Sequence, residues 1–188
     1  MTHRFDPKNL ARLDSPERRA LLPPEKTLHT IGLTEGDTLL DIGAGIGYFS
    51  IPALDIVGPH GKVIAADLSS EMLAELQRRA GARPGLTILR NEEGRLPLVD
   101  ATVDRALLAF VLHEIPDAVA FLTEVRRVLK PGGHIASIEW RPIETPMGPP
   151  VAERLAEAEA RRLLETAHFT LTAEGTLNAA HYYMVAAR

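Results

Sequence analysis

The sequence contains no cysteine. This absence excludes a disulfide scaffold, thiolate zinc sites, iron–sulfur clusters and thiol nucleophiles, and it leaves the redox compartment open. The seven histidines are scattered along the chain, with no close pair at the spacing of metal ligands. We therefore expect no metal site.

Long apolar runs and a strong excess of one charge are also missing. No stretch of about 18 apolar residues is present that would span a bilayer, and the polar N-terminal segment lacks the apolar core of a signal peptide. With 25 acidic against 21 basic residues, the chain has no basic surface for nucleic acid. We expect a cytoplasmic protein with no membrane span and no nucleic-acid partner.

What is present is typical of one folded domain. The chain has 188 residues, 45% of them hydrophobic, and a net charge of −4. A chain of this size buries about 70% of the surface that it exposes when unfolded, which is enough for a core without cross-links. We expect a single domain overall, with a helical arm or lid over residues 1–35 and the main domain over residues 36–188.

From Thr38 onward, short apolar segments alternate with helical patterns. The expected strands are nearly continuous apolar runs, as in strands covered on both faces, at residues 39–42, 63–66, 86–89, 104–110 and 134–140. Helices are expected over 71–80, 117–129 and 151–167, the last with Val151, Leu155, Ala158 and Leu163 inward. Two β-prone runs, 169–175 and 181–187, predict an antiparallel hairpin. The pattern indicates an α/β fold: a Rossmann-like, doubly wound, mostly parallel sheet of seven strands with this hairpin at its edge.

The first expected strand runs directly into the glycine-rich segment DIGAGIGY, residues 41–48. In an open α/β sheet, ligands bind where a strand's carboxyl end meets the next helix, and glycines let backbone amides approach the ligand. A dinucleotide loop would have glycine where Tyr48 stands, and it would place a pyrophosphate beside Asp41. The Lys-Ser/Thr pair of a Walker loop is absent. A nicotinamide-dependent oxidoreductase is therefore the less favoured enzyme class.

A cationic ligand without phosphate fits this loop better. S-adenosylmethionine (SAM) carries an ammonium, a carboxylate and a sulfonium group. Asp41 can pair with the ammonium, directly or through water, and the following helix's amino end suits the carboxylate. Asp67, which follows the second expected strand, can accept hydrogen bonds from both ribose hydroxyls. Both acids also have a plainer interpretation, as residues that form turns or cap helices.

Five segments in this order and spacing resemble the class I SAM-dependent methyltransferases, most of all the small bacterial group related to the ubiquinone/menaquinone-type C-methyltransferases. They are LLDIGAGIGYFSI, VIAADLSSEML, NEEGRLPL, VDRALLAFVLHEIPD and LKPGGHIASIEW, within residues 38–140. The resemblance implies methyl transfer from SAM to a small-molecule acceptor, with S-adenosylhomocysteine (SAH) as product. A SAM-binding sensor or a non-catalytic partner subunit is the alternative. The oligomeric state is left open, with a homodimer among the options.

The resemblance also implies positions for the cofactor. It places the methionine end at Asp41, Gly43, Gly45 and Gly47, and the ribose at Asp67. It implies that Leu68 packs on the adenine, that Glu92, with Glu93 as its competitor, accepts from the adenine amino group, and that the backbone of Phe110 contacts the methionine portion.

Candidates for the chemistry follow the later strands. Methyl transfer from a sulfonium needs alignment and exclusion of water, and it needs a base only if the acceptor arrives with a proton. His113 titrates in the right range and is the first candidate for a catalytic base, with a purely structural role as the alternative. Phe5, Glu114 and Trp140 are candidate substrate contacts, although packing or a frayed terminus also explains the aromatic residues. The acceptor atom is left open between oxygen, nitrogen, carbon and sulfur.

Overall fold

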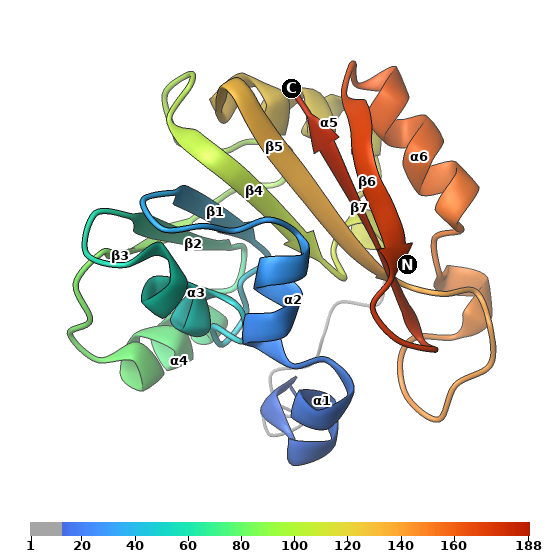
Figure 1. Cartoon of the computed structure of the whole chain (residues 1–188), viewed down its shortest axis with the longest axis horizontal. Helices are drawn as coiled ribbons and strands as arrows, with labels where there is room; N and C mark the ends of the chain where they lie inside the picture. The colour runs from blue at the N-terminus through green and yellow to red at the C-terminus, as the bar shows by residue number, and fades with distance from the viewer. Residues whose placement is uncertain (1–12) are drawn as a thin grey trace. The chain divides into compact units, whose positions relative to one another are not determined.

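The structure is a computed structural model that describes residues 13–188. The chain divides into two compact units, of which the first ends at Glu93 and the second runs from Gly94 to Arg188. Figure 1 traces the elements of both units in chain order, and each unit is described here by itself.

The first unit is built on three parallel strands in the order β3-β2-β1. The strands are β1 (Thr38–Ile42), β2 (Lys62–Asp67) and β3 (Leu86–Arg90), and the helices are α1 (Pro16–Leu21), α2 (Pro24–Thr30), α3 (Ser50–Val57) and α4 (Ser70–Ala80). Ile42 lies opposite Ala66, and Asp67 lies opposite Arg90, so the carboxyl ends of the three strands meet at one edge. Helices α3 and α4 connect the strands and pack on them (Figure 1).

Helix ends in this unit follow the signals of the sequence. Ser69 caps α4, because its hydroxyl accepts a hydrogen bond from the backbone N–H of Met72 at 3.2 Å, and Gly81 follows the last turn with a φ of 62°. Ser15 caps α1 in the same way, with the N–H of Arg18 as the donor at 3.2 Å. The bounds of α4 confirm the helix predicted over residues 71–80 to within one residue.

The second unit carries four strands in the order β4-β5-β7-β6. They are β4 (Val103–Ala109), β5 (Leu129–Trp140), β6 (Thr170–Thr176) and β7 (His181–Ala187), with α5 (Ala118–Val128), α6 (Glu157–Thr166) and the short 3-10 helices η2 (Leu112–Glu114) and η3 (Val151–Glu153). Strands β4 and β5 are parallel, whereas β7 is antiparallel to both of its neighbours. The predicted hairpin is confirmed, and with it the fold class: a Rossmann-like α/β protein with seven strands, mostly parallel, and antiparallel strands at the C-terminal end.

Apolar side chains on the strands supply the core. Leu40 of β1 and Leu107 and Leu108 of β4 are completely buried. Burying one leucine side chain contributes about 1.5–3 kcal/mol. Strands β1 and β2 bury consecutive residues rather than every second one, which explains why their segments appear as continuous apolar runs.

The helix predicted over residues 151–167 is wrong in its first part. The chain makes only a 3-10 turn at Val151–Glu153, and α6 begins at Glu157. Between them Arg154 turns inward and is only 9% exposed. Its guanidinium donates to the carbonyls of Pro149, Arg141 and Ile143 at 2.9, 3.1 and 2.6 Å. This residue therefore binds the preceding loop instead of continuing a helix.

The later start also changes the buried face of α6. Ala160 and Leu164 are buried, whereas Ala158 is exposed and Leu163 is half-buried. The predicted inward face is therefore wrong, because its period was counted from Val151 through a segment that is not helical.

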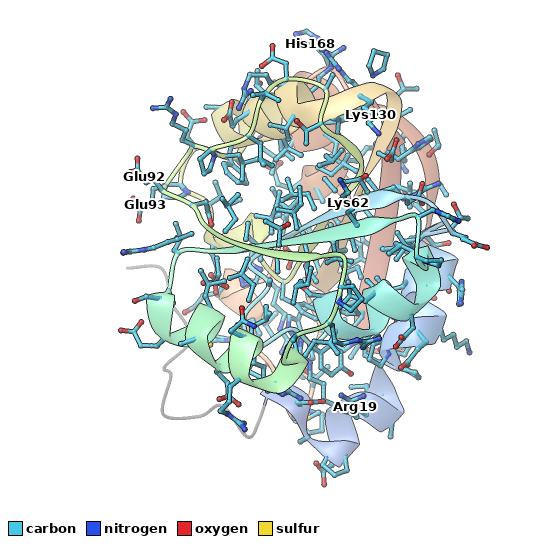
Figure 2. The ribbon with its side chains drawn as sticks, turned by 90° about the vertical axis from the view of Figure 1, so that its left-hand side faces the viewer. Arg19, Lys62, Glu92, Glu93, Lys130 and His168 are labelled. Carbon is cyan, nitrogen blue, oxygen red and sulfur yellow. The ribbon has the colours of Figure 1, made fainter. Side chains whose placement is uncertain are left out.

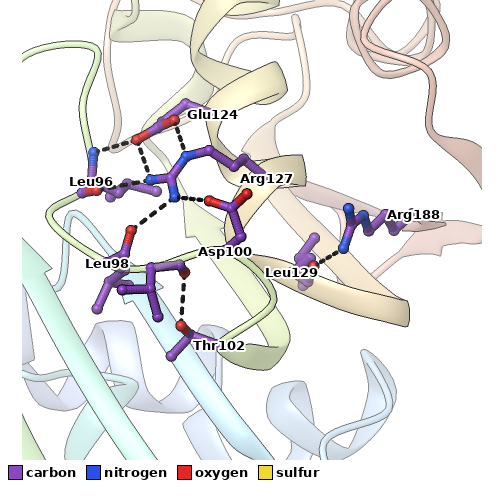
Figure 3. A network of polar contacts seen from close by, with 9 residues as sticks. Leu96, Leu98, Asp100, Thr102, Glu124, Arg127, Leu129 and Arg188 are labelled. Atoms are coloured by element: carbon purple, nitrogen blue, oxygen red, sulfur yellow. Dashed lines mark hydrogen bonds and ion pairs between the residues drawn. The ribbon is translucent and has the colours of Figure 1, made fainter.

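Residues 94–102, which precede β4, are held by Arg127 of α5 (Figure 3). The guanidinium donates to the carbonyls of Leu96 and Leu98 at 3.1 and 2.9 Å. It also donates to both oxygens of Glu124, at 2.7 and 2.8 Å, and to Asp100 at 2.6 Å. Glu124 in turn accepts from the N–H of Leu96 at 3.0 Å. One side chain thus satisfies several acceptors of a segment without regular structure.

Replacing Arg127 by methionine should therefore destabilise the fold. The carbonyls of Leu96 and Leu98 lose a charged donor, so we expect a loss of about 2–3 kcal/mol in the free energy of unfolding. Chemical denaturation measures it. The matched control is Arg162→Met, whose exposed partner Glu159 lies on the same helix; it should change stability little. Equal losses in the two variants would contradict the role given to Arg127.

Candidate functional site

In the first unit, the glycine-rich segment after β1 is anchored on the end of β2. The backbone N–H groups of Gly43 and Ala44 both donate to the carbonyl of Ala66, at 2.8 and 3.0 Å. This places the segment at the carboxyl edge of the sheet, where open α/β sheets bind their ligands.

Asp67 braces the same segment from the end of β2. One carboxylate oxygen accepts from the N–H of Gly45 at 2.8 Å, and the other accepts from the N–H of Ser69 at 2.9 Å. The turn-forming role considered for Asp67 is therefore present. It does not exclude a ligand, because each carboxylate oxygen can accept more than one hydrogen bond and the residue is only half-buried. Its role toward a ribose stays a prediction.

The glycines of the segment are needed for different reasons. Gly43, Gly45 and Gly47 have φ values of 70°, 54° and 85°, in the left-handed region that favours glycine. A Cβ on Gly47 would meet Ile51 at 3.0 Å and Leu76 at 3.1 Å, so the packing leaves no room for a side chain at this position. A Cβ on Gly45 would meet no atom of residues 13–188 within 4 Å. Gly45 therefore combines a backbone conformation that favours glycine with open space in front of it.

Asp41 is a buried carboxylate close to this loop. It is 2% exposed, and the hydroxyl of Ser50 in α3 donates to it at 2.5 Å. Burial and the nearby charge of Asp67 raise its pKa to about 7, although hydrogen bonds from the hydroxyl and the backbone of Ser50 oppose the shift. Asp41 is therefore about half protonated at neutral pH, and a ligand cation would stabilise its ionised form. Ser50 was not predicted as a site residue.

The residues predicted to contact the adenine, Leu68, Glu92 and Glu93, are all exposed. Leu68 is 37% exposed and offers an apolar surface. Glu92 and Glu93 are exposed, and Figure 2 shows both carboxylates pointing outward. The preceding Asn91 is only 7% exposed, and its Oδ1 has no hydrogen-bond partner within residues 13–188. Asn91 was missed by the sequence analysis.

Tyr48 joins the glycine-rich segment to the N-terminal helices. Its hydroxyl donates to the carbonyl of Leu22 at 2.6 Å, and the guanidinium of Arg18 lies 4.2 Å from its ring centre. Asp14 forms ion pairs with both Arg19 and Arg79. The described part of the arm is thus bound to the loop. Phe5 lies outside the described residues, and the lid stays a prediction.

In the second unit, aromatic rings gather at the carboxyl ends of β4 and β5. Phe110 has a φ of 63°, which is strained for a residue with a side chain. Its ring centre lies 5.6 Å from that of Trp140 and 5.1 Å from that of His181. Phe110 and Trp140 are half-buried residues. The centre of the Trp140 ring also lies 4.2 Å from that of His181 and 5.2 Å from the guanidinium of Arg154. The predicted contact of Phe110 with a cofactor stays a prediction.

His113 is held by a carboxylate that the sequence analysis did not connect with it. Its Nδ1 lies 2.7 Å from Oε2 of Glu139, and its backbone N–H donates to Oε1 at 3.3 Å. Burial opposes protonation of the ring, but the hydrogen bond and charge of Glu139 outweigh burial and raise the pKa of His113. Glu114 lies farther away, with Oε1 at 4.0 Å from Nε2.

Within residues 13–188, no three or more histidine, aspartate or glutamate side chains lie together as metal ligands would. None of the helices in that range has the length and apolar character to cross a membrane.

Comparison with known proteins identifies relatives of this arrangement. Residues 40–137 match the family model described as "Methyltransferase domain". The chain is 35% identical over 127 residues to a demethylmenaquinone methyltransferase of Beutenbergia cavernae, covering 65% of this chain and 50% of that protein. It is 30% identical over 115 residues to the enzyme of the same name from Bacillus licheniformis, covering 61% and 50%. The chain thus spans about half the length of these curated relatives.

A solved structure matches nearly the whole chain. It is described as a SAM-dependent methyltransferase from Aquifex aeolicus, with a TM-score of 0.93 and 35% sequence identity. The match covers 98% of this chain and 99% of that one.

The groups of the first unit fit SAM. Asp41 offers a negative charge to an ammonium, Gly45 faces open space, and Asp67 and Asn91 offer acceptors to hydroxyl and amino groups. SAM has a donor for each acceptor, and it has no phosphate to repel the two carboxylates.

Replacing Asp41 by asparagine should stabilise the protein and weaken SAH binding. A carboxyl whose pKa is raised on folding makes stability fall as the pH rises from its unfolded pKa to about 7. Asparagine still accepts from Ser50 but never ionises. At pH 8 we expect a gain on the order of 2 kcal/mol and an SAH affinity at least roughly tenfold lower. Thermal unfolding and calorimetry measure the two, and a destabilised variant with unchanged affinity would refute this interpretation.

Gly45→Ala should act on the ligand more than on the fold. The added methyl group meets no atom of residues 13–188 but occupies the open space. SAH affinity should therefore fall about tenfold or more, while stability falls by about 1 kcal/mol. Gly36→Ala is the matched control, because Gly36 also has a positive φ, 85°, and no atom within 4 Å of a Cβ. It should lose similar stability and keep its affinity. Equal affinity in both variants would place the ligand elsewhere.

Proposed function

This chain belongs to the methyltransferase domain family, as a class I SAM-dependent methyltransferase related to the quinone methyltransferases, and on that premise we propose that it methylates a small-molecule acceptor. The observation that carries the proposal is the pairing of Asp41 with the glycine-rich segment. A buried carboxylate with a pKa near 7 destabilises the fold when it is ionised, unless a cation pairs with it. It lies next to a backbone loop with open space at Gly45.

The residues of the first unit would hold the cofactor as follows. Asp41 pairs with the ammonium, the backbone at Gly45 lies against the methionine portion, and Asp67 accepts from the ribose hydroxyls while it keeps Gly45 and Ser69 in place. When bound, SAM supplies a methyl group on an already activated sulfonium. The protein's own contribution is then to align the acceptor and to keep water away.

Asn91 is the better candidate for the adenine amino group than Glu92 or Glu93. A buried acceptor without a donor costs about 1–3 kcal/mol, so Oδ1 of Asn91 calls for a donor from a ligand or from water. The two glutamates are exposed and already solvated. The exposed part of Leu68 supplies an apolar surface for the ring at the same edge.

Two observations support an aromatic acceptor. By their names, the curated relatives methylate demethylmenaquinone, which carries a quinone ring. In the second unit, the half-buried Phe110 and Trp140 lie close together at the carboxyl ends of parallel strands, and aromatic rings pack well against flat apolar ligands. A naphthohydroquinone is therefore the first acceptor to test.

Binding and turnover are tested separately. Calorimetric titration should show SAH binding in the micromolar range or tighter and no comparable binding of NADH. Labelled SAM should then transfer its methyl group to an acceptor from a panel of hydroquinones, phenols, amines and thiols. Tight NADH binding without SAH binding would overturn the cofactor assignment. SAH binding without transfer to any member of the panel would overturn the proposed turnover and favour a protein that senses SAM.

The adenine contact makes a separate prediction. Wild-type protein should prefer SAH to S-inosylhomocysteine, which has an oxo group in place of the amino group, because Oδ1 of Asn91 accepts from the one and repels the other. Asn91→Leu should reduce this preference about tenfold or more. The control Glu92→Gln should keep it. The reverse pattern would assign the contact to Glu92.

A further inference from the structure

The second unit contains a buried ion pair that the binding of SAM does not require. Glu139 of β5 is completely buried, opposite Tyr182 of the neighbouring β7. Both of its oxygens face His113, one at the ring Nδ1 and one at the backbone N–H, at 2.7 and 3.3 Å. A carboxylate taken fully out of water is tolerated when donors surround it in this way.

The contact with Glu139 fixes the orientation and the tautomer of the His113 ring. With the carboxylate at Nδ1, the proton of the neutral ring lies on Nδ1 and the lone pair lies on Nε2. Nε2 is 4.0 Å from Glu114 Oε1, which is too long for a hydrogen bond. The side chain of His113 keeps 11% of its surface exposed, whereas Glu139 keeps none. Of these two side chains, that of His113 is therefore the one with an exposed part.

We propose that His113 is the general base of the methyl transfer, that Glu139 is its positioning residue, and that the acceptor is a hydroxylated aromatic ring that arrives with its proton. This inference rests on the proposed function, and it narrows the acceptor class. Tertiary amines and thioethers carry no proton to remove, so a base held in this way would serve no purpose for them. A phenol or hydroquinone carries such a proton, and its ring is suited to packing against the half-buried Phe110 and Trp140.

The proton and the electrons balance in this step. The acceptor O–H bond breaks, its proton moves to Nε2 of His113, and its electron pair stays on the acceptor. That pair forms the bond to the methyl carbon at oxygen or, relayed through the ring, at a ring carbon that then loses its own hydrogen as a proton. The pair of the S–CH3 bond stays on sulfur. Glu139 stabilises the imidazolium that forms, and His113 afterwards returns the proton to solvent.

The charges around His113 set the pH dependence. Glu139 from β5, Glu114 from η2 and Glu153 from η3 all raise its pKa above the ordinary value, and burial of the ring works against them. Tyr182 from β7 stays protonated beside Glu139, because burial and that charge raise its pKa. A base acts in its neutral form. Turnover should therefore rise as the pH increases through the raised pKa of His113.

The first test needs no acceptor. The pKa of His113 is measured by NMR titration of the ring in the ligand-free wild type, in Glu139→Gln and in Glu153→Gln. Glutamine keeps the shape and an acceptor for Nδ1–H but removes the charge, so Glu139→Gln should lower the pKa of His113 clearly. Glu153→Gln, a more distant and exposed carboxylate, should change it little. An unchanged pKa in Glu139→Gln would overturn the proposal.

The second test uses turnover of 1,4-naphthohydroquinone. Glu139→Gln should move the rising limb of the pH–kcat profile to lower pH and reduce the plateau about ten- to a hundredfold, and His113→Asn should reduce kcat about a hundredfold or more. SAH affinity should stay unchanged in both variants. With 4-nitrophenol, which is ionised at pH 8, His113→Asn should approach the wild-type rate, because no proton has to be removed.

The outcomes separate this inference from the proposed function. A wild type that transfers no methyl group to any acceptor overturns the proposed function. A wild type that transfers it, together with a His113→Asn variant equally active on naphthohydroquinone, overturns only the base. Equal defects of His113→Asn on naphthohydroquinone and 4-nitrophenol would give the dyad a structural role. If Glu139→Gln fails to fold, Glu139→Asp is substituted, with a smaller pKa shift expected.

Discussion

The burial of Asp41 is the constraint on which the first unit depends. A carboxylate inside a protein loses its hydration, and here hydrogen bonds from the hydroxyl and the backbone of Ser50 compensate for part of that loss. The nearby Asp67 adds repulsion, so the group holds a proton up to a pH of about 7. The fold tolerates this cost because β1 and α3 fix both partners. A site that is under-compensated without ligand is well suited to a cation, since the ligand supplies the missing charge.

The two units use buried carboxylates in opposite ways. Asp41 has hydrogen bonds from the hydroxyl and the backbone of Ser50 and still has a raised pKa, whereas Glu139 has the ring and the backbone N–H of His113 on its two oxygens. The first arrangement favours a ligand that brings positive charge. The second favours a neighbour that becomes positive during turnover. Both carboxylates lie at the ends of parallel strands, where the backbone of an α/β sheet stops and side chains are free to bind ligands.

Features that depend on neighbours in the sequence were predictable. The glycine-rich segment and the C-terminal hairpin both have local signals, and both are present. Partners from distant segments were not predictable. Glu139 lies 26 residues from His113, and nothing in either segment indicates that they meet. The adenine contact was predicted at the neighbouring Glu92 and Glu93 rather than at Asn91. A sequence shows which residues are charged, but it does not show which side chain is buried. The shortened α6 has a similar cause, since the inward turn of Arg154 depends on carbonyls of the preceding loop.

The most direct test of the account is the number of protons released when SAH binds at pH 7. Calorimetry in buffers of different ionisation enthalpy measures this number. If the ammonium pairs with Asp41, the pKa of that carboxyl falls on binding, and about half a proton should be released per SAH bound. The release should disappear in Asp41→Asn. SAH binding with no proton release, or with the same release in wild type and variant, would contradict the central claim that Asp41 is kept buried and half protonated to receive a ligand cation.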